Sequence, residues 1–234
     1  MGFDWLAPHY RWMEWLLAGG KLQRCRTAFL SALPRPRHAL LLGEGNGRFL
    51  IELLRAHPGT RFTCVDASAR MLQATQARLK HEGISAERGR FIHANVLEWI
   101  PPAAEFDLIV SNFFLDCFPR DQLEILIHRM TGVAAPPAHW LVADFREPPE
   151  GWQRWRARWI LRLMYWFFRH ATALSARQLT PPDDILQHCG FKLAGRRLHE
   201  WGLLHSDVWE LRQPSCPPFQ RAETLKKVSA TLPS

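Results

Sequence analysis

The sequence predicts a single α/β domain built on a doubly wound, mostly parallel sheet of seven strands. Two observations carry this prediction. Short apolar runs alternate with segments of helical periodicity, and the chain then closes with two extended segments around a short turn. Such alternation is typical of βαβ units, and the short turn favours an antiparallel hairpin. A length of 234 residues and a hydrophobic fraction of 47% suit one domain with a full core and exclude intrinsic disorder.

Each predicted strand is a short apolar or β-branched run, and helical spacing of apolar residues fills the intervals. The strands are expected at 38–42, 61–66, 91–94, 106–111 and 139–144, with the hairpin at 191–200 and 203–212. Helices are expected from Phe49 to Pro58, after an N-cap at Ser68, from Asp121 to Met130, over 152–169, and from an N-cap at Thr180 with Pro181 in the first turn to Gly190.

The same features divide the chain into three segments. Residues 1–37 read as an N-terminal helical cap that ends in prolines, and residues 38–213 form the core, with a helical insert at 150–180. Residues 214–234 are rich in Pro, Ser and Lys and are expected to form a tail.

The sharpest motif is the glycine loop LLGEGNG at 41–47, between the first predicted strand and its helix. Gly43, Gly45 and Gly47 allow a tight turn and close approach of the backbone to a ligand. Asp66 ends the next strand, where a carboxylate can accept hydrogen bonds from ribose hydroxyls. Strand, loop, helix, strand and acid in this order predict a nucleoside-binding crevice at the carboxyl edge of the sheet.

Four motifs in order resemble those of class I S-adenosylmethionine-dependent methyltransferases: the glycine loop, VDASARML at 65–72, HANVLEW at 93–99 and FDLIVSNFFLDCF at 106–118. The closing segments are similar to the family's terminal antiparallel strands. The resemblance implies a Rossmann-like methyltransferase fold and S-adenosylmethionine as cofactor, with S-adenosylhomocysteine as product. It assigns cofactor contacts to Gly43, Glu44, Gly45, Gly47, Asp66, Ala67, Asn95, Val96, Ser111 and Asn112.

The chain departs from the family pattern at two positions. Leu41 stands where an acid is usual, and Glu44 is hypothesised to substitute for it. Asn95 replaces the usual Asp at the adenine position, and its amide oxygen can still accept a hydrogen bond from an amino group.

Methyl transfer from a sulfonium needs alignment, together with a proton acceptor where the methyl acceptor carries a proton. We expect Asp116, just past the fourth strand, to serve as this base, and a loop anchor for the helix at Asp121 is the alternative. The opening FDWLAPHY resembles the N-terminal segment of ubiquinone and menaquinone methyltransferases and implies a catalytic role for Tyr10. The expected substrate pocket comprises Trp12, Trp159, Tyr165 and His205.

The charge and the tryptophan content bear on the part of the chain that is expected to hold the methyl acceptor. Lys and Arg outnumber Asp and Glu by 30 to 22, and seven of the eleven Trp lie in 5–15 and 152–166. At 100° per residue, the Trp of 152–169 form one stripe with a row of Arg beside it and an apolar face beyond. Such a helix either caps its own domain or lies on an anionic membrane surface. Both alternatives predict an apolar acceptor pocket.

The sequence therefore predicts a cytoplasmic enzyme, in one hypothesis peripheral to the inner membrane face, that transfers methyl groups from S-adenosylmethionine to a small, apolar or lipid-like acceptor. One alternative is a catalytically silent cofactor-binding or scaffold protein. Another is a methyltransferase acting on nucleic acid, which is disfavoured because the arginines are tied to a large apolar face. The five Cys show no zinc spacing, so no metal is expected, and no run of residues is long and apolar enough to span a membrane.

Overall fold

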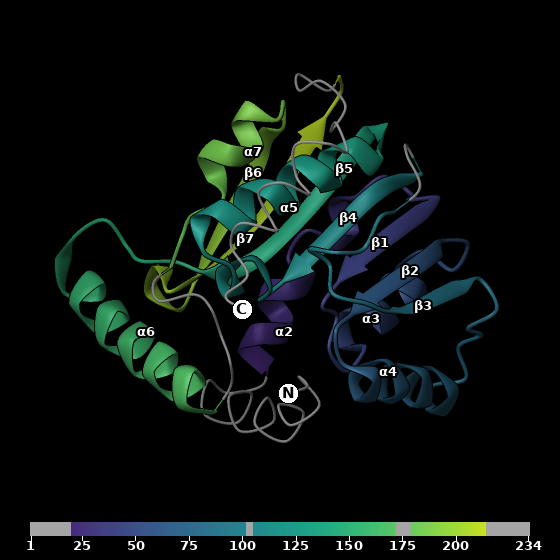
Figure 1. Cartoon of the computed structure of the whole chain (residues 1–234), viewed down its shortest axis with the longest axis horizontal. Coiled ribbons are helices and arrows are strands. Elements are labelled where there is room, and N and C mark those ends of the chain that lie inside the picture. Colours follow the sequence, from purple (N-terminus) through teal and green to yellow (C-terminus); the bar gives the residue numbers. More distant parts are fainter. Residues whose placement is uncertain (1–19, 102–104, 172–178, 214–234) are drawn as a thin grey trace, which may run out of the picture.

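The computed structural model describes residues 20–101, 105–171 and 179–213, with the side chains of 165–171 outside the description. Within these ranges the chain forms one seven-stranded sheet in the order β3-β2-β1-β4-β5-β7-β6 (Figure 1). The first five strands run parallel, and β7 pairs antiparallel with both β5 and β6. The predicted doubly wound sheet with a closing hairpin is confirmed.

The strands match the predicted runs closely. Their bounds are β1 His38–Leu42, β2 Arg61–Asp66, β3 Gly89–His93, β4 Phe106–Asn112, β5 Ala134–Phe145, β6 Lys192–His199 and β7 Leu204–Leu211. All five residues of β1 are buried, as expected of a central strand that is covered on both faces. The fifth strand begins five residues before its predicted start, because the chain leaves its preceding helix directly into the sheet at Ala134.

Helices cover both faces of the sheet (Figure 1). They are α2 Gly20–Thr27, α3 Arg48–Ala56, α4 Ala69–His81, α5 Arg120–Val133, α6 Gly151–Ala171 and α7 Asp183–His188, with short 3₁₀ turns η2 Leu30–Ala32, η3 Leu115–Cys117 and η4 Glu200–Gly202. Apolar residues of α3 and α4 pack on one face, and those of α5 and α7 pack on the other. Ser68 caps α4 as predicted, since its hydroxyl accepts a hydrogen bond from the Met71 N–H at 3.3 Å.

The predicted start of α7 is wrong. The helix begins at Asp183, not at Pro181, and its N-cap is Pro182 with no side-chain hydrogen bond. The physical reason is the double proline: the residue before a proline is kept out of the helical region, so Pro181 cannot occupy the first turn.

Helix α6 stands at one side of the molecule, beyond the carboxyl end of β5 (Figure 1). Buried Ala157 and Leu161 attach it to a cluster that includes Phe113 and Phe145. No helix in the described ranges is long and apolar enough to cross a membrane.

Candidate active site

The glycine loop joins β1 to α3 with three residues in the left-handed region. Gly43, Gly45 and Gly47 have φ of 59°, 71° and 79°, a conformation that costs other residues about 1–2 kcal/mol. A Cβ on Gly43 would lie 2.3 Å from the ring of Phe114, and one on Gly47 would lie 2.9 Å from Cγ2 of Thr75. The loop therefore holds its backbone against neighbouring side chains in a way that only glycine permits at Gly43 and Gly47.

Glu44 fastens this loop to the helix that follows it. Its carboxylate accepts hydrogen bonds from the backbone N–H groups of Phe49 at 2.9 Å and Leu50 at 3.0 Å, at the start of α3. Burial raises the pKa of Glu44 to about 7, although these two hydrogen bonds and Arg26 act in the opposite direction. Leu41, at the usual acidic position, lies fully buried in the apolar core. This acid of the loop therefore binds the backbone of the first turn of α3.

Two polar residues lie at the carboxyl ends of β2 and β3. Asp66 ends β2, and its Oδ1 accepts a hydrogen bond from the Ser68 N–H at 2.8 Å. Asn95 donates from Nδ2 to Glu98 at 2.8 Å and accepts from the Leu97 N–H at 3.1 Å, so its amide closes a local turn.

The residues after Asp66 and Asn95 play backbone or core roles. The Ala67 carbonyl accepts a hydrogen bond from Nε2 of His93 at 3.0 Å. Val96 is buried in the core cluster under α5.

Ser111 and Asn112 are the last two residues of β4, and they differ in whether their side chains are hydrogen-bonded. The hydroxyl of Ser111 accepts a hydrogen bond from Nε1 of Trp140 at 2.9 Å and is fully buried, so this side chain is used by the core. Asn112 is only 7% exposed, and in the structure neither its amide nitrogen nor its amide oxygen has a hydrogen-bond partner. A buried, unpartnered amide is costly, about 1–3 kcal/mol, and it is the group a polar ligand would satisfy.

These residues fit a nucleoside cofactor. The loop, Asp66 and Asn112 follow β1, β2 and β4, which are neighbours in the sheet and run in one direction. Their carboxyl ends therefore meet at one edge, where open α/β sheets bind ligands. The orphaned amide of Asn112 supplies a donor and an acceptor there.

A pair of buried carboxyl groups lies at the same edge. Asp116, in η3, is 7% exposed, and Asp144, near the end of β5, is 3% exposed. Oδ2 of Asp144 accepts a hydrogen bond from the Asp116 N–H at 3.2 Å, and the two side chains hydrogen-bond to each other. Burial raises the pKa of Asp116 to about 6, and burial together with the Asp116 charge raises the pKa of Asp144 well above its usual range. The pair therefore holds a proton near neutral pH.

Sequence reasoning missed Asp144. A signal was available, because this acid ends the predicted fifth strand beside the fourth, as Asp116 follows the fourth. Carboxyl ends of adjacent parallel strands meet at one sheet edge, so the two acids could have been paired.

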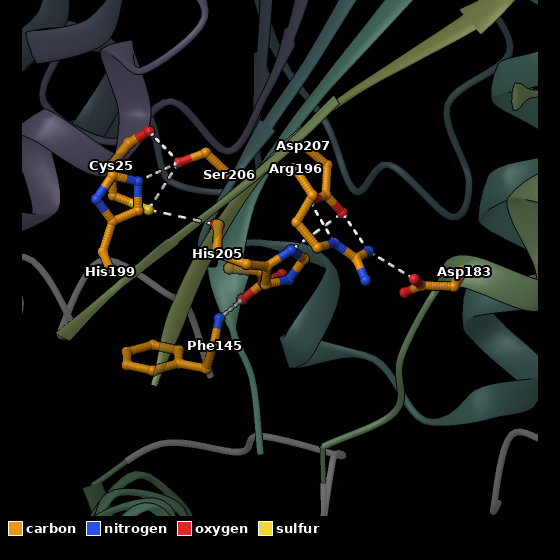
Figure 2. A network of polar contacts seen from close by, with 9 residues as sticks. Cys25, Phe145, Asp183, Arg196, His199, His205, Ser206 and Asp207 are labelled. Carbon is orange, nitrogen blue, oxygen red and sulfur yellow. Dashed lines mark hydrogen bonds and ion pairs between the residues drawn. The ribbon is translucent and has the colours of Figure 1, made fainter. Parts of the chain in front are cut away.

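His205 lies in a polar network on the hairpin side of the sheet (Figure 2). It is 3% exposed and pairs in register with Asp144. Its Nδ1 is 3.0 Å from Oδ2 of Asp207, which is ion-pair distance but out of line for a hydrogen bond. Arg196 bridges Asp207 at 2.6 Å and Asp183 at 2.5 Å. Burial alone would raise the pKa of Asp207, but Arg196 and His205 hold it below its ordinary value.

Two phenylalanine rings lie close to the carboxyl pair in the sequence, on the same two strand ends. Phe113 follows β4 with a φ of 53°, and its ring lies 5.4 Å from that of Phe145 at the end of β5. Both rings pack in one cluster with the inner face of α6. Trp159, which was predicted to line the substrate pocket, has a side chain that is 56% exposed, and Ala157 and Leu161 occupy the inward face of the helix.

Three predicted site residues cannot be placed. Tyr10 and Trp12 lie outside the described residues, and the side chain of Tyr165 in α6 is likewise outside them. In the part of the chain that the structure does describe, no group of three His, Cys, Asp or Glu could hold a metal ion.

Comparisons with known proteins agree with this geometry. A family model described as "Methyltransferase domain" matches residues 39–137. The demethylmenaquinone methyltransferase of Chlamydia felis (strain Fe/C-56) is 36% identical over 76 residues, which are 32% of this chain and 33% of the relative. The chain thus spans about a third of that relative's length.

Two solved structures show the same fold. A 1,6-didemethyltoxoflavin-N1-methyltransferase from Burkholderia thailandensis, described with bound S-adenosylhomocysteine, matches with a TM-score of 0.66 and 19% identity, over 90% of this chain and 86% of that one. The mitomycin 7-O-methyltransferase MmcR matches with a TM-score of 0.64 and 17% identity, over 90% of this chain and 61% of that one. Residues 39–137 are therefore similar to methyltransferase domains, and the chain shares its fold with the two solved methyltransferases.

Proposed function

We propose that this protein transfers a methyl group from S-adenosylmethionine to a small, apolar or lipid-like acceptor. The observation that carries the transfer is the left-handed glycine loop beside an unpartnered, buried Asn112 at the carboxyl edge of the sheet. The cofactor, when bound, supplies a methyl group already activated on a sulfonium. The chain has to align the acceptor, which contributes up to about 7–11 kcal/mol.

Three groups of this chain would hold the cofactor. The loop backbone from Gly43 to Gly47 approaches closely, Asp66 offers a carboxylate at the end of β2, and Asn112 offers a donor and an acceptor. Glu44 acts indirectly by fixing the loop on α3. Asn95 contributes only if its turn opens, because its amide already bonds to Glu98 and Leu97.

Two aromatic rings on the strand ends that carry the carboxyl pair support the proposed acceptor class. Phe113 and Phe145 present aromatic rings under α6, which suits a planar or apolar molecule. The curated relative is named for demethylmenaquinone, a quinone with an apolar tail, which supports the same class.

We further propose that Asp116 accepts the acceptor's proton while Asp144 positions it. A carboxyl group whose pKa is about 6 is suited to general base catalysis near neutral pH. The Asp144 carboxyl binds the Asp116 N–H and shares a hydrogen bond with its side chain, so it fixes both the place and the basicity of that group.

The test is methyl transfer from cofactor labelled in the methyl group, with the full chain and two acceptor pools, a lipid extract and a water-soluble extract. We expect label in the lipid pool. Label only in the water-soluble pool contradicts the acceptor class, and no label in either favours a silent cofactor-binding protein. Once an acceptor is known, Asp116→Asn should lower kcat at least about a hundredfold, and Asp144→Asn should displace the pH profile of kcat. Unchanged kcat in Asp116→Asn contradicts the base assignment.

A further inference from the structure

The outer surface of α6 is apolar, although its inner face is already buried. Ala157 and Leu161 are 1% and 5% exposed and pack against the domain. On the opposite side of the helix, large apolar side chains are more than half exposed: Trp152 59%, Trp155 68%, Trp159 56% and Leu163 61%. One apolar face therefore anchors the helix, and the second one faces solvent.

This exposed face continues onto the neighbouring turn. Trp201 of η4 is 60% exposed, and its ring lies 6.2 Å from that of Trp152. The guanidinium of Arg156 lies 4.9 Å from the centre of the Trp201 ring. The surface formed by Trp152, Trp155, Trp159, Leu163 and Trp201 is called the tryptophan face below.

Positive charge borders the tryptophan face. Helix α6 contains five Arg and no Asp or Glu across its 21 residues. Arg154 and Arg158 each lie 2.8 Å from Glu147, one carboxylate between two cations, and Arg162 is exposed beside the Trp row. The helix as a whole therefore keeps a net positive charge.

We propose that the tryptophan face docks on an anionic lipid surface, with α6 lying in the plane of the interface. Indole rings favour the headgroup region, where their apolar body and N–H are both satisfied. Arginines at the border meet anionic headgroups. The helix is too polar and too charged to cross the bilayer, which agrees with its inner face being fixed to the domain. This docking does not depend on the methyl transfer proposed above.

The experiment is flotation of the full-length protein with phosphatidylcholine vesicles, with and without about one third phosphatidylglycerol. We expect the protein to float with the anionic vesicles at low salt and to be released as salt rises, because headgroup attraction is screened. Trp155→Ala/Leu163→Ala and Arg162→Glu should each reduce the bound fraction at least about fivefold. Equal recovery with and without anionic lipid overturns the proposal.

Matched variants separate a specific face from general stickiness. Ile100→Ala/Leu198→Ala removes exposed apolar side chains elsewhere, at 67% and 53% exposure, and should float like the wild type. Arg35→Glu makes the same charge reversal ahead of β1, at the opposite edge of the parallel strands. If these controls lose flotation as strongly as the α6 variants, the docking face is wrong.

The same variants test two other partners for the tryptophan face, single-stranded RNA and a second copy of this chain. Tighter retention on single-stranded RNA than on anionic vesicles, lost in the same α6 variants, overturns the lipid assignment. The lipid assignment is also overturned if the wild type does not float but forms a concentration-dependent dimer that Trp155→Ala/Leu163→Ala abolishes. Unchanged thermal midpoints show that the α6 variants are folded, and Arg162→Glu alone carries the test if the double variant is not.

Discussion

The proposed cofactor side and the proposed acceptor side of this molecule are built by different means. At the ends of β1, β2 and β4, backbone geometry makes the site: three left-handed glycines, an acid at a strand end and an unpartnered amide. Just after β4 and at the end of β5, packing makes it, with buried carboxyls, paired phenylalanines and a helix laid over them. Local turn geometry therefore determines the proposed cofactor side, whereas packing between distant segments determines the proposed acceptor side.

The largest expected effect comes from adding a side chain in the glycine loop. Gly43→Ala should lower the free energy of unfolding by about 2–5 kcal/mol, because left-handed strain adds to a clash with Phe114. Gly45→Ala meets nothing within 4 Å, so it should cost only the strain, about 1–2 kcal/mol. Urea unfolding measures both. Equal losses would mean that the Phe114 contact does not constrain the loop.

An intermediate effect concerns the carboxyl pair. Because burial raises the pKa of Asp116 from 3.8 to about 6, the native state binds more protons than the unfolded state across that window. The free energy of unfolding should therefore fall as pH rises through it, by about 3 kcal/mol. Asp116→Asn should remove that part of the slope, while Glu44, with its own raised pKa, keeps a similar contribution. Parallel pH profiles for wild type and variant would contradict the shared proton.

The smallest expected effect is a gain in stability, from a substitution at the end of β4. Asn112→Leu should raise the stability of the cofactor-free protein by about 1 kcal/mol, since it removes an unpartnered buried amide. It should also weaken S-adenosylhomocysteine binding at least about tenfold. The neighbouring control, Ser111→Ala, should instead destabilise the protein by about 1–3 kcal/mol, because it orphans the Trp140 N–H. Destabilisation by both variants would show that Asn112 serves the core.

The sheet could be predicted because its signals are local. Apolar runs placed every strand within a few residues, and Ser68 identified the start of α4. The start of α7 was wrong because two prolines in a row were treated as a first helical turn. The tight glycine loop and the place of Asp66 at a strand end could be predicted because the sequence shows closely spaced glycines after one apolar run and an acid at the end of the next.

The packing of the proposed acceptor side could not be predicted from the sequence, for a physical reason. Helical periodicity shows which residues of 152–169 share a stripe, but both stripes of α6 are apolar, so the pattern does not say which one packs. The sequence placed Trp159 in the substrate pocket, whereas the packed position on the inner face of the helix belongs to Leu161. Phe113 and Phe145 come together only through the pairing of β4 with β5.

The central claim is that the edge of β1, β2 and β4 is a cofactor site, and calorimetric titration of S-adenosylhomocysteine into the full-length protein tests it most directly. We predict saturable binding with one site per chain, lost in Gly43→Ala and weakened in Asp66→Ala, and retained in the Arg35→Glu control. No binding of S-adenosylhomocysteine or S-adenosylmethionine at millimolar concentration would contradict the account.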